Sequence, residues 1–265
     1  NKSIKMKSTI KSGSAEALQI MLNASVPEQT KTYKPVSHQE LMDLTLESIH
    51  QSGYELASQE YSVAEDGGVA NGKYTISNVA DSEMQLQVAW QNSYNKKVSL
   101  KFALGTRIMI CANGMVSGNY GSFKSKHVGD VQTVAPASIV EYIKKGSSAF
   151  SSLQRDRDLF KQYEATDQVQ AELLGRMFIQ DDLITSTQLN IIKRELVNPT
   201  HNYGADGSLW ELYNHATFAL KGSHPSRWMS AHSELHTFFS NIIAPSPAII
   251  DAPSFVTADN QIEMF

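Results

Sequence analysis

The spacing of hydrophobic residues changes partway along this chain from every second residue to every third or fourth, and that change limits the folds it can adopt. Segments 54–63, 73–79, 84–90 and 98–110 have the composition and spacing of β-strands. In 84–90 apolar and polar residues alternate, so one face is expected in a core and the other in water. The first two segments are separated by Glu65-Asp66-Gly67-Gly68, a strong turn signal. The segments therefore predict an antiparallel β meander.

Helical patterns flank the predicted sheet on both sides. Ser37 can cap a helix that starts near His38, with Glu40 as the capping-box partner, and this helix should stop at Ser52-Gly53. After residue 130 the pattern is helical, and helix starts are expected at Ala135-Pro136, Thr185, Ser208 and Pro225. The predicted fold class is therefore α+β, with a helix, an antiparallel β meander and a mostly helical C-terminal half.

The same patterns divide the chain into regions. Residues 1–35 form a basic arm, which either follows phosphates or is a frayed, partly disordered end; its lysines are Lys2, Lys5, Lys7 and Lys11. Residues 36–130 hold the first helix and the sheet, and residues 131–243 form a helical region packed on that sheet. Residues 244–265 are a flexible, proline-punctuated tail, either a tip that recruits a protein partner or a plain disordered end.

Composition sets limits on the class of protein. With 265 residues, 41% of them hydrophobic, the chain can bury a substantial core. Its one cysteine, Cys111, excludes an internal disulfide and favours a reducing compartment. No apolar run has the length of a membrane span or the pattern of a signal peptide. We therefore expect a cytoplasmic protein without a membrane partner.

A basic segment interrupts this acidic chain. Between Glu83 and Asp130 there is no acidic residue, while lysine and arginine contribute six positive charges. The net charge of −4 thus leaves −10 on the rest of the chain. Residues two apart on a strand share a face, so Lys97, Ser99 and Lys101 are expected on an exposed face opposite an apolar one.

Lysines beside aromatic rings suit the phosphates and stacked bases of single-stranded nucleic acid. The alternative is a solvated face whose lysines protect a sheet edge from aggregation. The predicted nucleic-acid contacts are Trp90, Asn92, Tyr94, Lys96, Lys97, Lys101, Arg107, Lys124, Lys126 and His127.

Other polar motifs carry weaker signals. Asn113-Gly114 and Gly118-Asn119-Tyr120-Gly121 are interpreted as tight turns in preference to an anion-binding nest. His232 and His236 lie four residues apart on a predicted helix, which suits either metal ligation or an aromatic packing layer. No Ser-His-Asp spacing or paired-carboxylate pattern is present. We therefore predict no catalytic residue and no cofactor, and leave open whether the protein is an enzyme.

Two motifs resemble those of a known family. One comprises Asn92-Ser93, a basic strand, Cys111-Ala112-Asn113-Gly114-Met115 and Lys126-His127; the other is Leu209-Trp210-Glu211-Leu212-Tyr213-Asn214-His215-Ala216-Thr217. Together they are similar to the signature of the phage/plasmid-like proteins, a family carried by mobile elements. Two segments depart from that signature: Tyr94-Asn95-Lys96-Lys97 replaces an acidic or glycine turn, and Asn214-His215-Ala216 replaces Asn-Ala-Val/Thr. The resemblance implies a cytoplasmic, DNA-related protein of a mobile element and gives no mechanism.

The order of helix, strands and helix also resembles the core of the single-strand annealing proteins of phage and eukaryotic recombination. This second resemblance is one of fold and has no residue-specific motif.

The sequence supports more than one functional hypothesis. In the first, the protein binds single-stranded DNA or RNA through a cationic sheet face, as a homo-oligomer that anneals or protects strands in recombination or replication. The alternative is a host-directed interaction protein, such as an inhibitor of a restriction or defence system, that uses its acidic helical half. A third hypothesis is a metal-dependent enzyme built on His232 and His236.

Overall fold

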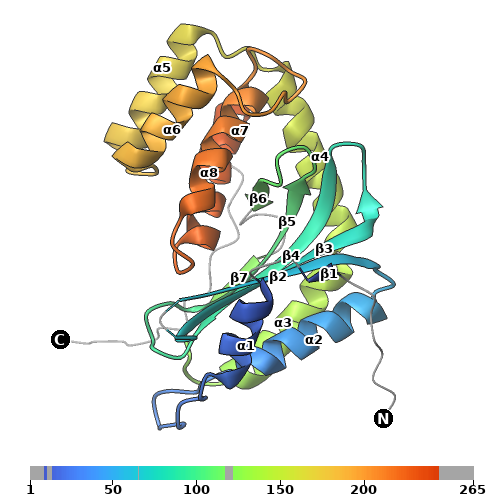
Figure 1. Ribbon diagram of the computed structural model, residues 1–265. Helices are drawn as coiled ribbons and strands as arrows, with labels where there is room; N and C mark the ends of the chain where they lie inside the picture. The colour runs from blue at the N-terminus through green and yellow to red at the C-terminus, as the bar shows by residue number, and fades with distance from the viewer. Residues whose placement is uncertain (1–8, 11–13, 65, 117–121, 245–265) are drawn as a thin grey trace, which may run out of the picture.

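The computed structural model describes residues 9–10, 14–64, 66–116 and 122–244 of the chain. A seven-stranded sheet lies at its centre (Figure 1), in the order β1-β2-β3-β4-β5-β6, with β7 also paired to β5. β1 runs parallel to β2, and the other described pairs are antiparallel. The expected meander is therefore confirmed as β2 to β5. The strands are β1 (Thr9–Ile10), β2 (Leu56–Ala64), β3 (Val69–Ala80), β4 (Met84–Ser93), β5 (Leu100–Ile108), β6 (Gly114–Val116) and β7 (Ser122–Ser125).

Helices precede and follow the meander, which confirms the predicted α+β class. Figure 1 shows α4 and α8 on opposite sides of the sheet, with α5 and α6 at one end of the molecule. The helices are α1 (Ser14–Asn23), α2 (His38–Gln51), α3 (Val131–Lys144), α4 (Gly146–Gln162), α5 (Asp167–Gly175), η1 (Arg176–Gln180), α6 (Ser186–Val197), α7 (Leu209–Ala219), η2 (Leu220–Gly222) and α8 (Trp228–Ile243).

Several helix starts follow local sequence rules. The Ser37 hydroxyl accepts a hydrogen bond from the Glu40 amide, and the Glu40 carboxylate accepts one from the Ser37 amide, which is the predicted capping box of α2. Thr185 and Gln188 make a second capping box at α6, and the Ser208 side chain caps α7. These ends are fixed by neighbours in the sequence and need no distant contact.

Two prolines do not open helices as the sequence predicts. α3 begins at Val131, so Pro136 lies inside it. Val131 and Ala135 are buried, and their burial favours a helix that begins before the proline. Pro225 lies in a turn before α8, where its carbonyl accepts hydrogen bonds from two side chains of the sheet. In both places tertiary contacts override local preference.

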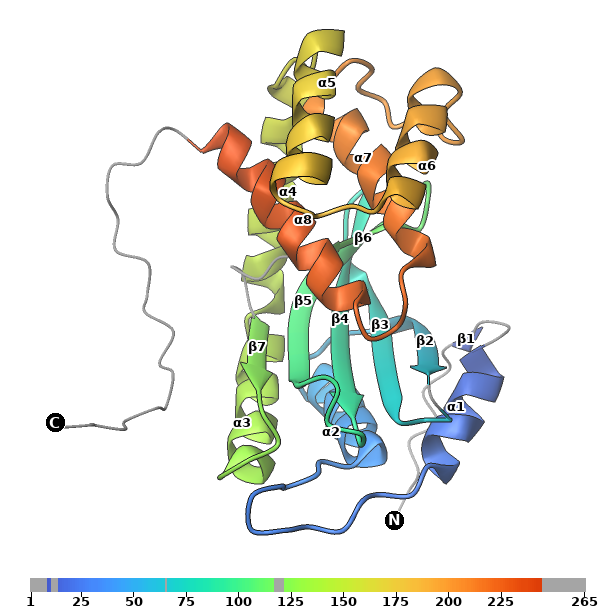
Figure 2. The same cartoon turned by 90° about the vertical axis from the view of Figure 1, so that its left-hand side faces the viewer.

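The sheet has one apolar and one polar face, because side chains alternate along β4 and β5. The apolar face packs against α3 and α4, with α2 packed on α3, and α8 crosses the polar face (Figure 2). Side chains of the apolar face include Met84, Leu86, Val88, Trp90, Leu100, Phe102 and Leu104. Side chains of the polar face include Gln87, Gln91, Lys101 and Arg107.

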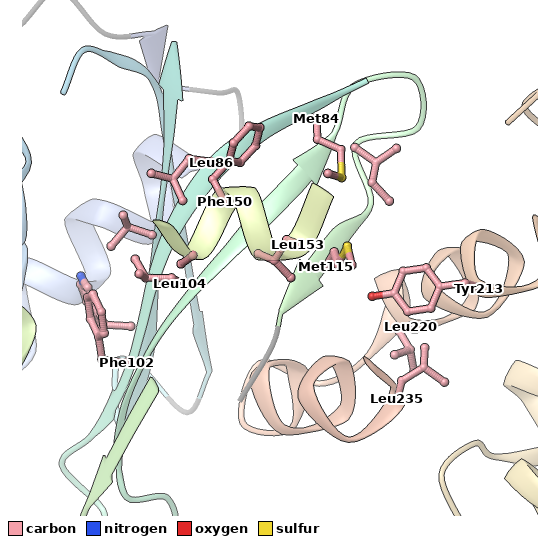
Figure 3. Close-up of a cluster of buried hydrophobic side chains, with 14 of the residues drawn as sticks. Met84, Leu86, Phe102, Leu104, Met115, Phe150, Leu153, Tyr213, Leu220 and Leu235 are labelled. Carbon is pink, nitrogen blue, oxygen red and sulfur yellow. The ribbon is translucent and has the colours of Figure 1, made fainter. Parts of the chain in front are cut away.

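Met115 of β6 connects this core to the C-terminal helices. Figure 3 shows it between the sheet and the side chains of Tyr213, Leu220 and Leu235. All four side chains are buried, so the sheet and the helical half share one hydrophobic core.

Ion pairs hold α4 to the turn between β3 and β4. The Arg157 guanidinium contacts the Asp81 carboxylate, and Lys161 Nζ lies 2.6 Å from Glu83 Oε1. Burial alone would raise the pKa of Asp81, but hydrogen bonds from Gln154, two backbone amides and Arg157 together lower it to about 2. Asp81 is therefore ionised throughout the neutral range.

The predicted tail lies outside the described residues except for residue 244, whereas the predicted arm is described over residues 9–10 and 14–35. Within residues 1–35 the structure describes β1 and α1, and Ser14 at the start of α1 donates a hydrogen bond to the Tyr61 carbonyl. The lysines at positions 2, 5, 7 and 11, the motif at 118–121 and the tail from residue 245 are outside. None of the helices described here is long and apolar enough to cross a membrane.

Gly72 makes room for the largest side chain of the apolar face. A Cβ at this position would lie 2.6 Å from the Trp90 ring. Trp90 is fully buried, and its indole N–H donates to the Tyr74 hydroxyl at 3.0 Å. The indole has little freedom to move away.

We therefore expect Gly72→Ala to lower the free energy of unfolding by about 1–3 kcal/mol, because the Trp90 ring must shift inside a packed core. Gly175→Ala is the control: nothing lies within 4 Å of the added Cβ, and alanine suits a helix, so stability should stay equal or rise slightly. Urea denaturation measures both variants. Wild-type stability in Gly72→Ala would contradict this packing.

Candidate functional site

The predicted nucleic-acid contacts differ in how far they are exposed to solvent. Trp90, Asn92, Tyr94 and His127 are buried. Lys101 and Arg107 are partly buried, and the remaining lysines, Lys96, Lys97, Lys124 and Lys126, are exposed. The exposed basic groups can reach a ligand, whereas the buried side chains contact the interior of the protein.

Asn92 and Tyr94 hold the end of β4 to the start of α2. The Asn92 amide donates to the Val36 carbonyl at 2.7 Å and contacts His38 Nδ1 at 2.9 Å. The His38 ring stacks on Tyr94 with centroids 3.8 Å apart, and its Nε2 lies 3.0 Å from the Gly67 carbonyl. A neutral His38 with its proton on Nε2 satisfies both polar contacts.

This network makes stability depend on pH. Burial is the main cause that lowers the pKa of His38 to about 4, and the hydrogen bond to Gly67 opposes it. In the unfolded chain the pKa is about 6.5, so below that value the unfolded state binds more protons than the folded state. The contribution of His38 is therefore fully present above about pH 6.5 and is lost as the pH falls towards 4.

We expect the free energy of unfolding to fall across this window, with His38 contributing at most about 1.4 kcal/mol per pH unit. Urea denaturation at several pH values between about 7 and 5 measures the slope, to which the other buried histidines also contribute. His38→Gln should make the slope shallower, and His50→Gln, at an exposed position, should leave it unchanged. Equal slopes in the two variants would contradict the role of His38.

The polar face of the sheet is partly covered. The side chains of Asn71 and Gln91 both donate to the Pro225 carbonyl. Trp228 and Met229 of α8 form a small apolar cluster with sheet residues such as Ala103. The face that the sequence predicts to be exposed thus lies partly under a helix. Among the described residues, Lys124 and Lys126 at its edge are exposed and a pocket lies beside α8.

Basic residues gather where β5 pairs with β7. Lys101 and Lys124 face each other across this antiparallel pair, and Lys126 follows two residues after Lys124. Arg227, in the turn before α8, is close enough to Lys101 to affect its ionisation. We refer to Lys97, Lys101, Lys124, Lys126 and Arg227 as the basic edge.

Lys101 is the most constrained member of the basic edge. It donates a hydrogen bond to the Ser230 hydroxyl of α8. Burial lowers its pKa, the charges of Lys124 and Arg227 lower it further, and Glu234 opposes them. Like charges directly opposite on an antiparallel ladder destabilise it by up to about 1 kcal/mol. A bound anion would relieve this repulsion.

A pocket of about 330 Å³ lies between the polar face, β6 and α8. Its charged side chains are three cations and one acid, so the lining has a positive charge; they are Lys73, Arg107, Lys221 and Glu60. Trp228, His232 and Gly114 also line this pocket. A second hollow, of about 490 Å³ beside α1, has Glu16 and Asp66 in its lining and no basic residue. The first of these, which we refer to as the polar-face pocket, is the better match for an anion.

The two sequence motifs meet beside this pocket. The Asn113 side-chain amide donates to the Asn214 carbonyl and to the Thr217 hydroxyl, each at 3.0 Å, across more than a hundred residues of sequence. Lys221 Nζ donates to the Cys111 carbonyl at 2.5 Å. These contacts fix the turn between β5 and β6 against α7 and place Lys221 at the pocket.

His232 and His236 have different surroundings although they lie four residues apart on α8. The His232 ring lies 5.4 Å from the Trp228 ring and lines the polar-face pocket. His236 Nε2 lies 3.1 Å from Asp156 Oδ2 in the core between α4 and α8. Across the described part of the chain, no group of three or more His, Cys, Asp and Glu residues could hold a metal ion.

A family model matches most of this chain. The model of the family described as "Domain of unknown function (DUF932)" matches residues 28–234, more than three quarters of the chain. The chain belongs to this family. No curated protein and no solved structure matches it.

The DUF932 match covers the basic edge, the polar-face pocket and both motifs, and it omits α1 and the last part of α8. Sequence reasoning finds four of the five basic-edge residues but misses Arg227, and it misses Lys73 and Lys221 in the pocket. The sequence indicates Lys73 only weakly, as a basic residue at the start of a predicted strand. Arg227 and Lys221 carry no signal in the sequence, because only tertiary folding brings their turns to the sheet.

Within the DUF932 segment we expect Asn113→Ala to lower the free energy of unfolding by about 2–3 kcal/mol, because two buried hydrogen bonds are lost. Asn241→Ala, at an exposed position near the end of α8, is the control and should change it by less than about 0.5 kcal/mol. Urea denaturation measures both. Equal effects of the two substitutions would rule out a special role for Asn113.

Proposed function

We propose that this protein binds single-stranded DNA or RNA through its basic edge. The observation that carries the proposal is the pairing of Lys101 with Lys124 on one ladder, with Arg227 beside them. A phosphodiester backbone supplies a row of negative charges and would offset the mutual repulsion of these cations.

The partial burial of Lys101 favours this proposal over the alternative, in which the lysines are solvated and only protect the sheet edge from aggregation. A lysine that only protects an edge extends into water and keeps its ordinary pKa. Lys101 is instead partly desolvated, hydrogen-bonded to Ser230 and lowered in pKa. Holding a desolvated cation beside two others costs free energy, and an anionic ligand compensates for that cost.

The mode of binding follows from which side chains are accessible. Trp90 and Tyr94 are buried, so in this conformation base stacking on them does not contribute. Contacts would then be made mainly to phosphates, which predicts binding that tolerates sequence and depends strongly on salt. This mode suits strand annealing or protection in the recombination or replication of a mobile element, the setting that the motif resemblance implies.

One observation favours the alternative of a host-directed interaction protein. Ile179, in the short helix after α5, and Val197, at the end of α6, expose 81% and 87% of their surface. Both belong to the helical half, where such a contact was expected. Stable binding of a purified partner protein with no oligonucleotide binding would favour this second candidate.

Fluorescence anisotropy of a labelled single-stranded oligonucleotide tests the proposal. Affinity should fall steeply between about 50 and about 200 mM salt. We expect the double variant Lys101→Gln, Lys124→Gln to bind at least about tenfold more weakly, with a salt slope shallower by about 1.4, since each lost phosphate contact removes about 0.7.

Lys144→Gln together with Lys193→Gln is the matched control, because it removes the same charge from exposed positions on α3 and α6. The control should keep wild-type affinity. Absence of binding at the lower salt, or the same loss in both double variants, would refute the proposal.

A further inference from the structure

We infer that the polar-face pocket binds a phosphate monoester at the end of a nucleic-acid strand. This inference rests on the proposed function and adds a second, more selective site to it. The basic edge would hold phosphodiesters along the strand, and the pocket would hold its terminal phosphate.

The charge of the pocket matches a dianion. Lys73, Arg107 and Lys221 line it together with the single acid Glu60, which gives a formal charge of +2. A phosphate monoester carries about −1.5 to −2 at neutral pH, whereas a phosphodiester within a strand carries −1. Burial lowers the pKa of Lys221, Cys111 and Glu195 oppose this shift, and the charge of Arg107 adds to it. Two neighbouring cations thus already repel each other in the absence of ligand.

Two polar atoms in this lining have no hydrogen-bond partner within the described chain. They are Arg107 Nε and His232 Nδ1, and both are inaccessible to solvent. His232 is 1% exposed, and burial lowers its pKa to about 3, so the ring is neutral at pH 7. Leaving such groups unpaired costs free energy. Arg107 lines the pocket, and phosphate oxygens are suitable acceptors for the other N–H groups of its guanidinium.

Gly114 lines the pocket and has no side chain that would occupy part of it. A Cβ at this position would lie 3.6 Å from the Trp228 ring and 3.9 Å from both Gln87 Oε1 and the His232 ring. Alanine would therefore fit without a clash, but a longer side chain would extend into the space between these groups. At about 330 Å³ the pocket is at the lower end of the size range of small-molecule sites, large enough for a phosphate with part of its nucleotide.

The test uses one single-stranded oligonucleotide in three forms: with a 5′-phosphate, with a 3′-phosphate, and with neither. We expect one phosphorylated form to bind at least about tenfold more tightly than the unphosphorylated form in competition anisotropy. One added dianion on a long polyanion changes non-specific attraction only slightly, so a preference of this size requires a site.

Two variants assign the preference to the pocket. Gly114→Leu fills it, and Lys221→Gln removes one of its cations. In each, the preference should fall to within about twofold, and urea denaturation checks that the variant is folded. Lys193→Gln, which removes a charge from an exposed position on α6 that does not line the pocket, should keep the full preference.

The outcomes distinguish the inference from the proposed function. Salt-dependent binding with equal affinity for the three forms would overturn the pocket inference and leave the basic edge as the binding site. Titration calorimetry with a nucleoside monophosphate covers the other case. Binding of that nucleotide without binding of any strand would retain the pocket, with a free nucleotide as ligand, and would overturn the proposed function. A preference that survives in both pocket variants would place the phosphate elsewhere and overturn the inference.

Discussion

The buried side chain of Asn113 joins the two halves of this molecule, and the candidate sites depend on that junction. One amide group binds a backbone carbonyl and a hydroxyl of α7, and Met115, two residues further along, enters the core shared with the C-terminal helices. A buried amide needs its partners in fixed positions, whereas hydrophobic contacts tolerate sliding. The hydrogen bonds of Asn113 therefore set the register between the turn after β5 and α7, and the burial of Met115 adds hydrophobic contacts to the same junction. Lys221, at the end of that helical segment, is placed at the pocket by the same junction.

The packing of α8 on the polar face turns a broad surface into two smaller sites. An uncovered face would present lysines to water at full hydration, where each contributes little to binding an anion. Where α8 packs on the sheet, Lys101 of β5 and His232 of α8 both lose solvent, and burial is the main cause that lowers their pKa values. Charges in a partly desolvated setting interact more strongly with a ligand, since the local dielectric constant is lower. Under the proposed function, the fold would thus concentrate anion binding at the basic edge and in the polar-face pocket.

Local patterns are enough to predict the meander, the first turn, the capping box of α2 and the caps of α6 and α7, because strands, turns and caps depend on residues a few positions apart. The alternation along 84–90 puts Trp90 on the apolar face with Met84, Leu86 and Val88, so its burial could be predicted, whereas the same patterns could not show that Asn92 and Tyr94 would be buried. Alternation along β4 indicates which residues share a face, but His38 and Gly72, which surround these side chains, come from other elements. The lysines of β5 and β7 were identified from charge alone. Arg227 and Lys221 could not be predicted as site residues, because their turns approach the sheet only through the packing of α7 and α8.

The charge distribution limits what kind of nucleic-acid contact this protein can make. With −10 outside the basic segment and −4 in total, the molecule as a whole offers a polyanion no net attraction, and at physiological salt charges more than about 8 Å apart are largely screened. Attraction operates only where the basic edge is close to a phosphate, so long-range steering does not assist association. A duplex presents two phosphate strands and cannot bend sharply, and it would bring the second strand towards the acidic remainder. A flexible single strand can follow the basic edge alone and avoid that repulsion. Under the proposed function, the acidic surface would thereby favour single strands over duplexes.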